Sequence, residues 1–125
     1  MMRVLIVDDS SVMRKIVARG LRQAGFQIDE ILEAGHGQEG LDVLKGDKKV
    51  DLILSDWNMP VMDGLTFLKQ VRSSPLAIQS IPVVMVTTEG GESKVEAADA
   101  AGANGHIKKP FTTDMLQETL GKYMK

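Results

Sequence analysis

The chain has 125 residues, of which 43% are hydrophobic and 26% are charged, and its formal net charge is −2. This length and composition predict one folded domain over residues 1–125, and the near-neutral charge argues against a general nucleic-acid-binding surface. The chain lacks cysteine, which excludes disulfides and cysteine nucleophiles, and its first apolar run, residues 4–7, is too short for a signal peptide or membrane span. We therefore expect a cytoplasmic protein.

Three short apolar runs without alternation are typical of strands covered on both faces of a parallel sheet. They are residues 4–7, 52–54 and 83–86. Residues 28–34 mix charged with apolar side chains and fit an edge strand. Residues 105–109, stopped by Pro110, fit a short last strand, which makes five strands.

The segments between these strands have helical spacing. The first segment has an apolar side and, opposite it, a basic side. Ser10 or Ser11 can cap the start of this helix, and Gly25 can end it. The apolar side is Met13, Val17, Leu21 and Ala24, and the basic side is Arg14, Lys15, Arg19 and Arg22. Further helices are expected near residues 38–45, 65–72, 91–101 and 113–124.

Strand and helix alternate five times, and the connections are long enough for parallel crossovers. We therefore predict an α/β fold of the doubly wound, flavodoxin-like type, with five helices on two faces of a parallel sheet in the order 2-1-3-4-5. In such sheets, ligands bind beyond the carboxyl ends of the strands, where the winding direction reverses.

Polar side chains stand at these expected strand ends. Asp8 and Asp9 follow the first strand, Asp56 follows the third, Thr87 ends the fourth and Lys109 ends the fifth. Two carboxylates about 4 Å apart repel by roughly 4 kcal/mol near a protein surface. A cation would relieve this repulsion, and oxygen ligands without histidine or cysteine favour Mg²⁺.

With Mg²⁺ in place, one carboxylate could attack a phosphoryl group and form an acyl phosphate, while Lys109 and Thr87 contact the phosphoryl oxygens. Each residue also has an ordinary explanation. Asp8 and Asp9 could favour a helix N-terminus, Asp56 could be a turn residue, and Thr87 and Lys109 could be a strand-end and a solvated residue. Their joint placement at strand ends favours the chemical site.

Four stretches of the sequence resemble the response-regulator receiver family, and particularly its single-domain chemotaxis members. They are VLIVDDSSVMRKI, DLILSDWNMPVMDGLTFLKQVR, VVMVTTE and GHIKKPF. The resemblance covers essentially the whole chain, so we expect no fused output domain.

The resemblance implies specific residue roles. Asp56 is the phospho-acceptor, Asp8, Asp9, Asp56 and the backbone carbonyl of Asn58 hold the metal, Lys109 contacts the phosphate, and Thr87 is the switch hydroxyl. It also implies a cis bond between Lys109 and Pro110.

His106 departs from the family, which usually carries tyrosine or phenylalanine there. Strand alternation places it opposite Ile107 and Lys109, on the surface. It is either a polar substitute without a titration role or a group whose protonation biases the active state.

Other residues near the motifs have simpler interpretations. We interpret His36 as a solvated loop residue and Trp57 as a fluorescent reporter near the site. Asn58 and Glu89 match family positions that set the rate of acyl-phosphate hydrolysis. The basic side of the first helix could dock an acidic kinase surface or could be an ordinary solvated face.

The resemblance implies a phosphorelay response regulator, and not an enzyme beyond assisting its own phosphorylation and dephosphorylation. A histidine kinase, of the chemotaxis type, would donate to Asp56, and the fourth helix, fifth strand and fifth helix would bind a target such as the flagellar motor switch. A phosphatase is possible, and a monomer is expected, with no nucleic acid and no membrane insertion.

Three other functions can be compared with the sequence. A phosphate sink, or a receiver in a non-chemotaxis relay, would share the same residues. A flavodoxin-like electron carrier would place a Ser/Thr/Gly loop after the first strand. An aspartyl phosphatase would place its nucleophile there, with a second aspartate two residues later. Neither of the last two patterns is present.

Overall fold

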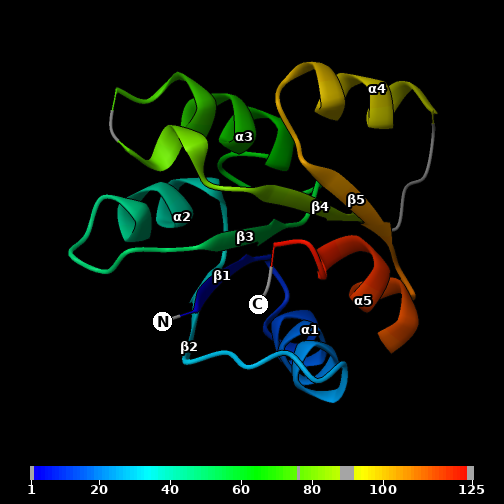
Figure 1. The fold of residues 1–125 in the computed structure, drawn as a ribbon. Helices are drawn as coiled ribbons and strands as arrows, with labels where there is room; N and C mark the ends of the chain where they lie inside the picture. Colours follow the sequence, from blue (N-terminus) through cyan, green and yellow to red (C-terminus); the bar gives the residue numbers. More distant parts are fainter. Residues whose placement is uncertain (1, 76, 88–91, 124–125) are drawn as a thin grey trace.

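Five strands form one parallel sheet in the order β2-β1-β3-β4-β5 (Figure 1), which confirms the predicted fold. This computed structural model describes residues 2–75, 77–87 and 92–123, without the side chains of residues 92–95. The strands are β1 (Arg3–Val7), β2 (Glu30–Ala34), β3 (Leu52–Ser55), β4 (Val83–Thr87) and β5 (Gly105–Lys108).

The central strands are apolar because helices cover both of their faces. All residues of β3 and β4 are buried, as are the last four of β1. In β2, at the sheet edge, only Ala34 is buried. The predicted edge strand was two residues too long, because the N–H of Asp29 bonds to the carbonyl of Met2 before the paired register with β1 begins at Glu30.

Helices form two layers around the sheet (Figure 1). α1 and α5 lie together on one face, and α2, α3 and α4 lie on the other. The helices are α1 (Ser11–Gln23), α2 (Gly37–Leu44), α3 (Gly64–Ser73), α4 (Glu92–Ala100) and α5 (Thr113–Leu120), and a 3₁₀ turn, η1 (Ala77–Ser80), precedes β4.

Side-chain caps set the helix starts. Ser10, not Ser11, caps α1, and Asp63 and Thr112 cap α3 and α5. The predicted last helix was too long, since α5 ends at Leu120, with Gly121 as its C-cap. Its predicted end at residue 124 and the predicted start of α4 at residue 91 lie outside the described residues.

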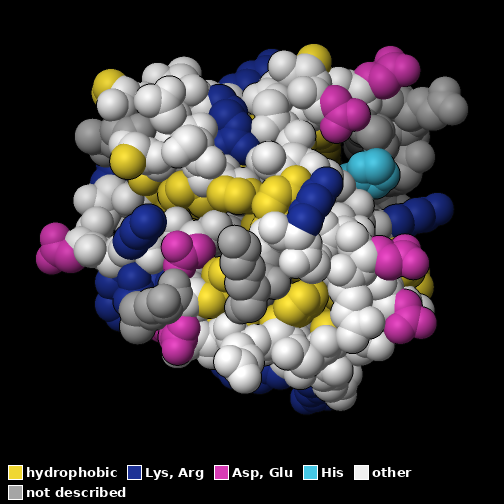
Figure 2. Space-filling view, in the orientation of Figure 1, with side chains coloured by type: hydrophobic (Ala, Val, Ile, Leu, Met, Phe, Trp, Pro, Cys, Tyr) yellow, Lys and Arg dark blue, Asp and Glu magenta, His cyan; other side chains and the backbone are white. Residues whose placement is uncertain are grey.

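The apolar core is divided by the sheet into two clusters. One lies under α2, α3 and α4 and includes Phe67, while the other lies under α1 and α5 and includes Leu21. In the orientation of Figure 2, apolar side chains form a band across the middle of the molecule, with charged side chains around it. None of the helices in the described ranges has the length and apolar content needed to cross a bilayer.

Because all strands are parallel, their carboxyl ends meet at one edge, which we call the carboxyl edge. The loops after β1, β3 and β5 leave the sheet there. β5 ends one residue earlier than predicted, at Lys108, although the N–H of Lys109 still bonds to the carbonyl of Thr87 at 2.8 Å. The Lys109–Pro110 bond is cis, as the family resemblance implied.

Candidate functional site

Three carboxylates meet at the carboxyl edge, as the sequence predicted. Asp8 and Asp9 follow β1 and Asp56 follows β3, and the two strands are neighbours in the sheet. One oxygen from each carboxylate lies within 4.8 Å of the others. Asp8 is buried, the Asp56 side chain is 15% exposed and Asp9 is open to solvent. The cluster is therefore closed on one side and accessible on the other.

Lys109 joins this cluster from the end of β5. Its Nζ lies 2.9 Å from Oδ2 of Asp8 and 3.6 Å from Oδ1 of Asp56, and the side chain is 9% exposed. The charges of three ionised carboxylates and this one ammonium sum to −2. That excess matches the charge of one divalent cation.

Backbone N–H groups orient two of the carboxylates. The N–H of Ser10 donates to Oδ1 of Asp8 at 2.9 Å, and the N–H of Trp57 donates to Oδ1 of Asp56 at 2.8 Å. The hydroxyl of Ser55 donates to the main-chain carbonyl of Asp56 at 3.0 Å. These contacts hold the acceptor candidate in place before any ligand binds.

Burial raises the pKa of the Asp56 carboxyl above its ordinary value. Lys109 and the N–H of Trp57 act in the opposite direction, while the neighbouring charges of Asp8 and Asp9 raise the pKa further. The Asp56 carboxylate is thus basic for an aspartate. A more basic carboxylate is a better nucleophile, and a cation beside it would stabilise its ionised form.

Thr87 and Asn58 also lie next to these residues. Thr87 is buried at the end of β4, where its carbonyl accepts the N–H of Lys109. Asn58 is exposed in the loop after β3, and its role as a metal ligand stays a prediction. Trp57 is partly buried against the core under α2 and α3, and Glu89 lies outside the described residues.

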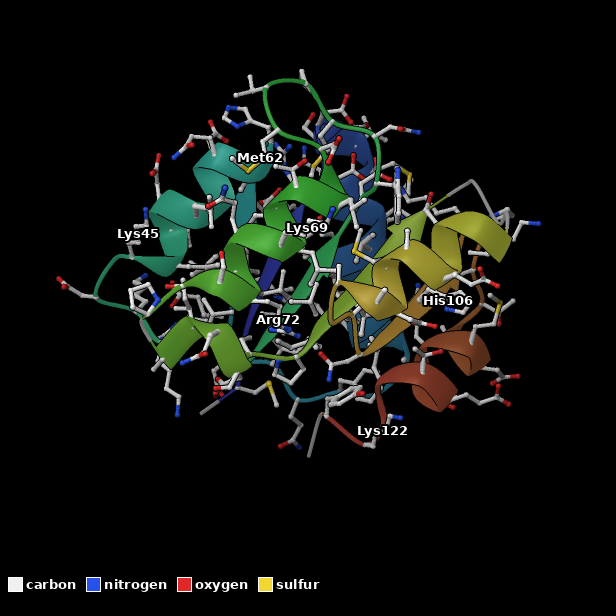
Figure 3. The ribbon with its side chains drawn as sticks, turned by 90° about the horizontal axis from the view of Figure 1, so that it is seen from above. Lys45, Met62, Lys69, Arg72, His106 and Lys122 are labelled. Carbon is white, nitrogen blue, oxygen red and sulfur yellow. The ribbon has the colours of Figure 1, made fainter. Side chains whose placement is uncertain are left out.

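The two histidines have different outcomes. His106 is exposed on β5, on the side opposite Ile107, as predicted, and Figure 3 places it on the side of the molecule that carries α4. The interpretation of His36 as a merely solvated residue was wrong. Its Nδ1 accepts the N–H of Glu39 at 3.3 Å and caps α2, which therefore starts at Gly37 and not at residue 38.

Two residues near the site were missed from the sequence. Arg14 was assigned to a solvated basic face, but its guanidinium donates to the main-chain carbonyl of Asp8 at 2.6 Å. Gly64 lies so close to the acceptor that a Cβ there would stand 2.0 Å from the main-chain oxygen of Asp56. The sequence did hold a signal for this close approach, because a glycine, Gly64, stands at the start of a predicted helix, directly after Asp63.

Comparison with known proteins identifies the family of the chain. The family described as the response regulator receiver domain matches residues 4–121. The chain belongs to this family. Receiver domains serve two-component response regulators, which are signalling proteins and not enzymes of the ordinary kind.

Individual receiver proteins are similar over nearly the whole chain. A chemotaxis protein CheY homolog of Campylobacter jejuni is 45% identical over 95% of this chain and 89% of its own length. Chemotaxis protein CheY1 of Helicobacter pylori is 44% identical over 95% of this chain and 94% of its own. The structure of CheY4 of Vibrio cholerae is 38% identical, covers 98% of both chains and has a TM-score of 0.84.

Proposed function

We propose that this receiver accepts a phosphoryl group on Asp56 from a histidine kinase, with Mg²⁺, and that it works in chemotaxis. The observation that carries the proposal is the Asp56 carboxylate, which is partly open to solvent, lies 3.6 Å from Nζ of Lys109 and is clustered with the carboxylates of Asp8 and Asp9. The chemotaxis proteins with 44–45% identity support the pathway. They favour it over a phosphate sink.

The acidic cluster fits a small hard cation. All of its donors are oxygens, and two oxygens bound to one Mg²⁺ lie at most about 4.2 Å apart. The cluster's oxygens, within 4.8 Å of one another, need only a small closure to reach that spacing. Asp8, Asp9, Asp56 and the carbonyl of Asn58 would hold the ion. When bound, Mg²⁺ neutralises negative charge on the carboxylates and on the phosphoryl group.

The protein's own residues then position the reaction. One Asp56 oxygen attacks phosphorus, and the bond from phosphorus to the histidine nitrogen breaks. Lys109, now close to both Asp8 and Asp56, would move its ammonium toward a phosphoryl oxygen. Thr87 would donate its hydroxyl to another. This rearrangement at the ends of β4 and β5 is the proposed switch.

The partners follow from the same proposal. The kinase would be of the chemotaxis type, and the face formed by α4, β5 and α5, which includes the exposed His106, would bind the flagellar motor switch or another target. The phosphorylated protein would bind its target as a monomer, and a phosphatase could shorten the lifetime of the phosphorylated state. The relay would operate in the cytoplasm. The domain would assist only its own phosphorylation and dephosphorylation.

Chemical labelling tests the acceptor. Acetyl phosphate or beryllium fluoride, added with Mg²⁺, is expected to change Trp57 fluorescence, because the N–H of Trp57 bonds to the acceptor carboxylate. Mass spectrometry should find acetyl-phosphate-derived label on Asp56 alone. Asp51→Asn is the matched control, since its carboxylate accepts the N–H of Arg3 at the opposite edge of the sheet.

Complete loss of label in Asp56→Asn, with unchanged label in Asp51→Asn, would support the proposal. Label that persists in Asp56→Asn would overturn it.

A further inference from the structure

Arg14 connects the acidic loop to the edge strand of the sheet. It lies near the start of α1, and its Nη1 donates to the main-chain oxygen of Asp8 at 2.6 Å. Its Nε donates to Oε1 of Glu33, on β2, at 2.8 Å. The Arg14 side chain is only 19% exposed, so the guanidinium is held between the two acceptors. A planar guanidinium is suited to such a double contact.

The peptide unit that Arg14 holds is the one that joins Asp8 to Asp9. Because this unit is planar, fixing the carbonyl of Asp8 also fixes the positions of the amide nitrogen and Cα of Asp9. The Asp8 carboxylate has its own supports in Ser10 and Lys109. Across the part of the chain that the structure describes, the exposed Asp9 carboxylate has no hydrogen bond or salt bridge. Its orientation therefore depends on the backbone.

We propose that Arg14, oriented by Glu33, is a positioning residue for the metal site. It holds the Asp8–Asp9 peptide so that the Asp9 carboxylate already faces Asp56 before a cation binds. The inference rests on the proposed function, because it concerns Mg²⁺ at the same carboxylates. Residues that orient metal ligands typically change metal affinity by about tenfold or more when they are removed.

Charge and positioning predict opposite effects for Arg14. The guanidinium is positive and lies beside a cation site, so removal of its charge alone would strengthen Mg²⁺ binding. Removal of its contact with the Asp8 carbonyl would weaken binding, because the loop would have to be ordered when the ion binds. The sign of the change therefore separates the two explanations.

The test is a Mg²⁺ titration of the full chain followed by Trp57 fluorescence. Arg14→Gln is expected to bind Mg²⁺ about tenfold more weakly than the wild type. Lys15→Gln is the matched control, since it removes one positive charge from the neighbouring, exposed position of α1. We expect this control to bind Mg²⁺ equally or slightly more tightly.

A second readout needs no metal. In ¹⁵N relaxation experiments without Mg²⁺, the order parameter of the Asp9 amide should fall in Arg14→Gln and stay unchanged in Lys15→Gln. Arg14→Lys keeps the charge but lacks the planar fork, so its Mg²⁺ affinity should also fall, by about threefold. This variant serves as the test should Arg14→Gln not fold.

Asp9→Ala in the same titration separates the two hypotheses. If Asp9→Ala weakens Mg²⁺ binding but both Arg14 variants bind as tightly as the wild type, the positioning role is overturned and the proposed site stands. If Asp9→Ala leaves Mg²⁺ binding unchanged, the proposed metal site itself fails. Weaker binding in all three variants, with a mobile Asp9 amide in Arg14→Gln, supports the inference.

Discussion

Charged side chains gather at both ends of the strands, but the carboxylates there have opposite electrostatic surroundings. At the edge where the strands begin, which we call the amino edge, Glu30 binds Nε of Arg3 at 2.8 Å and Nζ of Lys48 at 2.5 Å. Asp51 accepts the N–H of Arg3 at 2.9 Å. Lys48 and Arg3 lower the pKa of Glu30, so its charge is matched within the protein.

At the carboxyl edge, three carboxylates share one lysine, and the pKa of Asp56 is raised. A cluster left with excess negative charge is unfavourable for the isolated protein and favourable for binding a cation. The comparison indicates that the paired charges at the amino edge stabilise the fold. The excess negative charge at the carboxyl edge destabilises the fold but favours the binding of a cation.

The largest expected effect is steric and occurs at the carboxyl edge. A Cβ at Gly64 would lie 2.0 Å from the main-chain oxygen of Asp56 and 2.8 Å from Cε of Met85. Gly64→Ala should therefore lower the free energy of unfolding by about 3 kcal/mol or more, as measured by urea denaturation. In Gly105→Ala, the new Cβ would lie at an ordinary contact distance of 3.5 Å from Thr119, so we expect a change within about 0.5 kcal/mol. Equal effects would refute the steric explanation.

Removal of the crowded charge should stabilise the protein. Asp56→Asn is expected to raise the Mg²⁺-free stability at pH 7 by up to about 1 kcal/mol, because the side chain is partly solvated. A raised pKa in the folded state means that ionisation opposes folding above the ordinary value of 3.8. The advantage of asparagine should therefore shrink as the pH falls toward 4 in urea denaturation. If the stability difference between Asp56→Asn and the wild type grows as the pH falls, the raised pKa of Asp56 is contradicted.

A strained residue lies in the same loop as the site. Val61 has φ of 67° and is 80% exposed, so a β-branched side chain adopts a left-handed conformation without burial in return. Val61→Asn should stabilise the protein by about 1 kcal/mol in thermal denaturation. The exposed Val12, which lies within α1, provides a control, and Val12→Asn should change stability by less than about 0.5 kcal/mol.

The smallest effect is expected at the amino edge. Glu30→Gln should reduce stability only slightly at pH 7, because the Glu30 side chain is 31% exposed and its partner Lys48 is 55% exposed. A lowered pKa means that this contribution is present above the ordinary value of 4.5 and is lost as the pH falls through the folded-state pKa. Mg²⁺ affinity should stay unchanged in the same protein. A large loss of Mg²⁺ affinity would show that the two edges are coupled.

Strands and site residues were predictable from the sequence because their signals are local. Unbroken apolar runs mark β1, β3 and β4, and the polar residues directly after them converge because parallel strands end at one edge. β2 was predicted too long, since its mix of charged and apolar residues continues to Ile28, while Asp29 bonds to Met2 outside the ladder.

The missed features depend on contacts between distant parts of the chain. Helical spacing assigned Arg14 to a solvated face, yet its partners are a carbonyl in the preceding loop and Glu33 on another strand. His36 was missed because histidine is an uncommon cap. The positive φ of Val61 could not be predicted, because β-branched residues such as valine strongly prefer a negative φ.

The bond from Lys109 Nζ to Asp8 spans 101 positions of sequence. During synthesis, the ribosome therefore makes all three aspartates long before it makes the lysine that completes their surroundings. Until Lys109 has been made, the aspartates cannot have this ammonium beside them. The proposed site is therefore complete only once both ends of this 101-residue separation have been made and folded together.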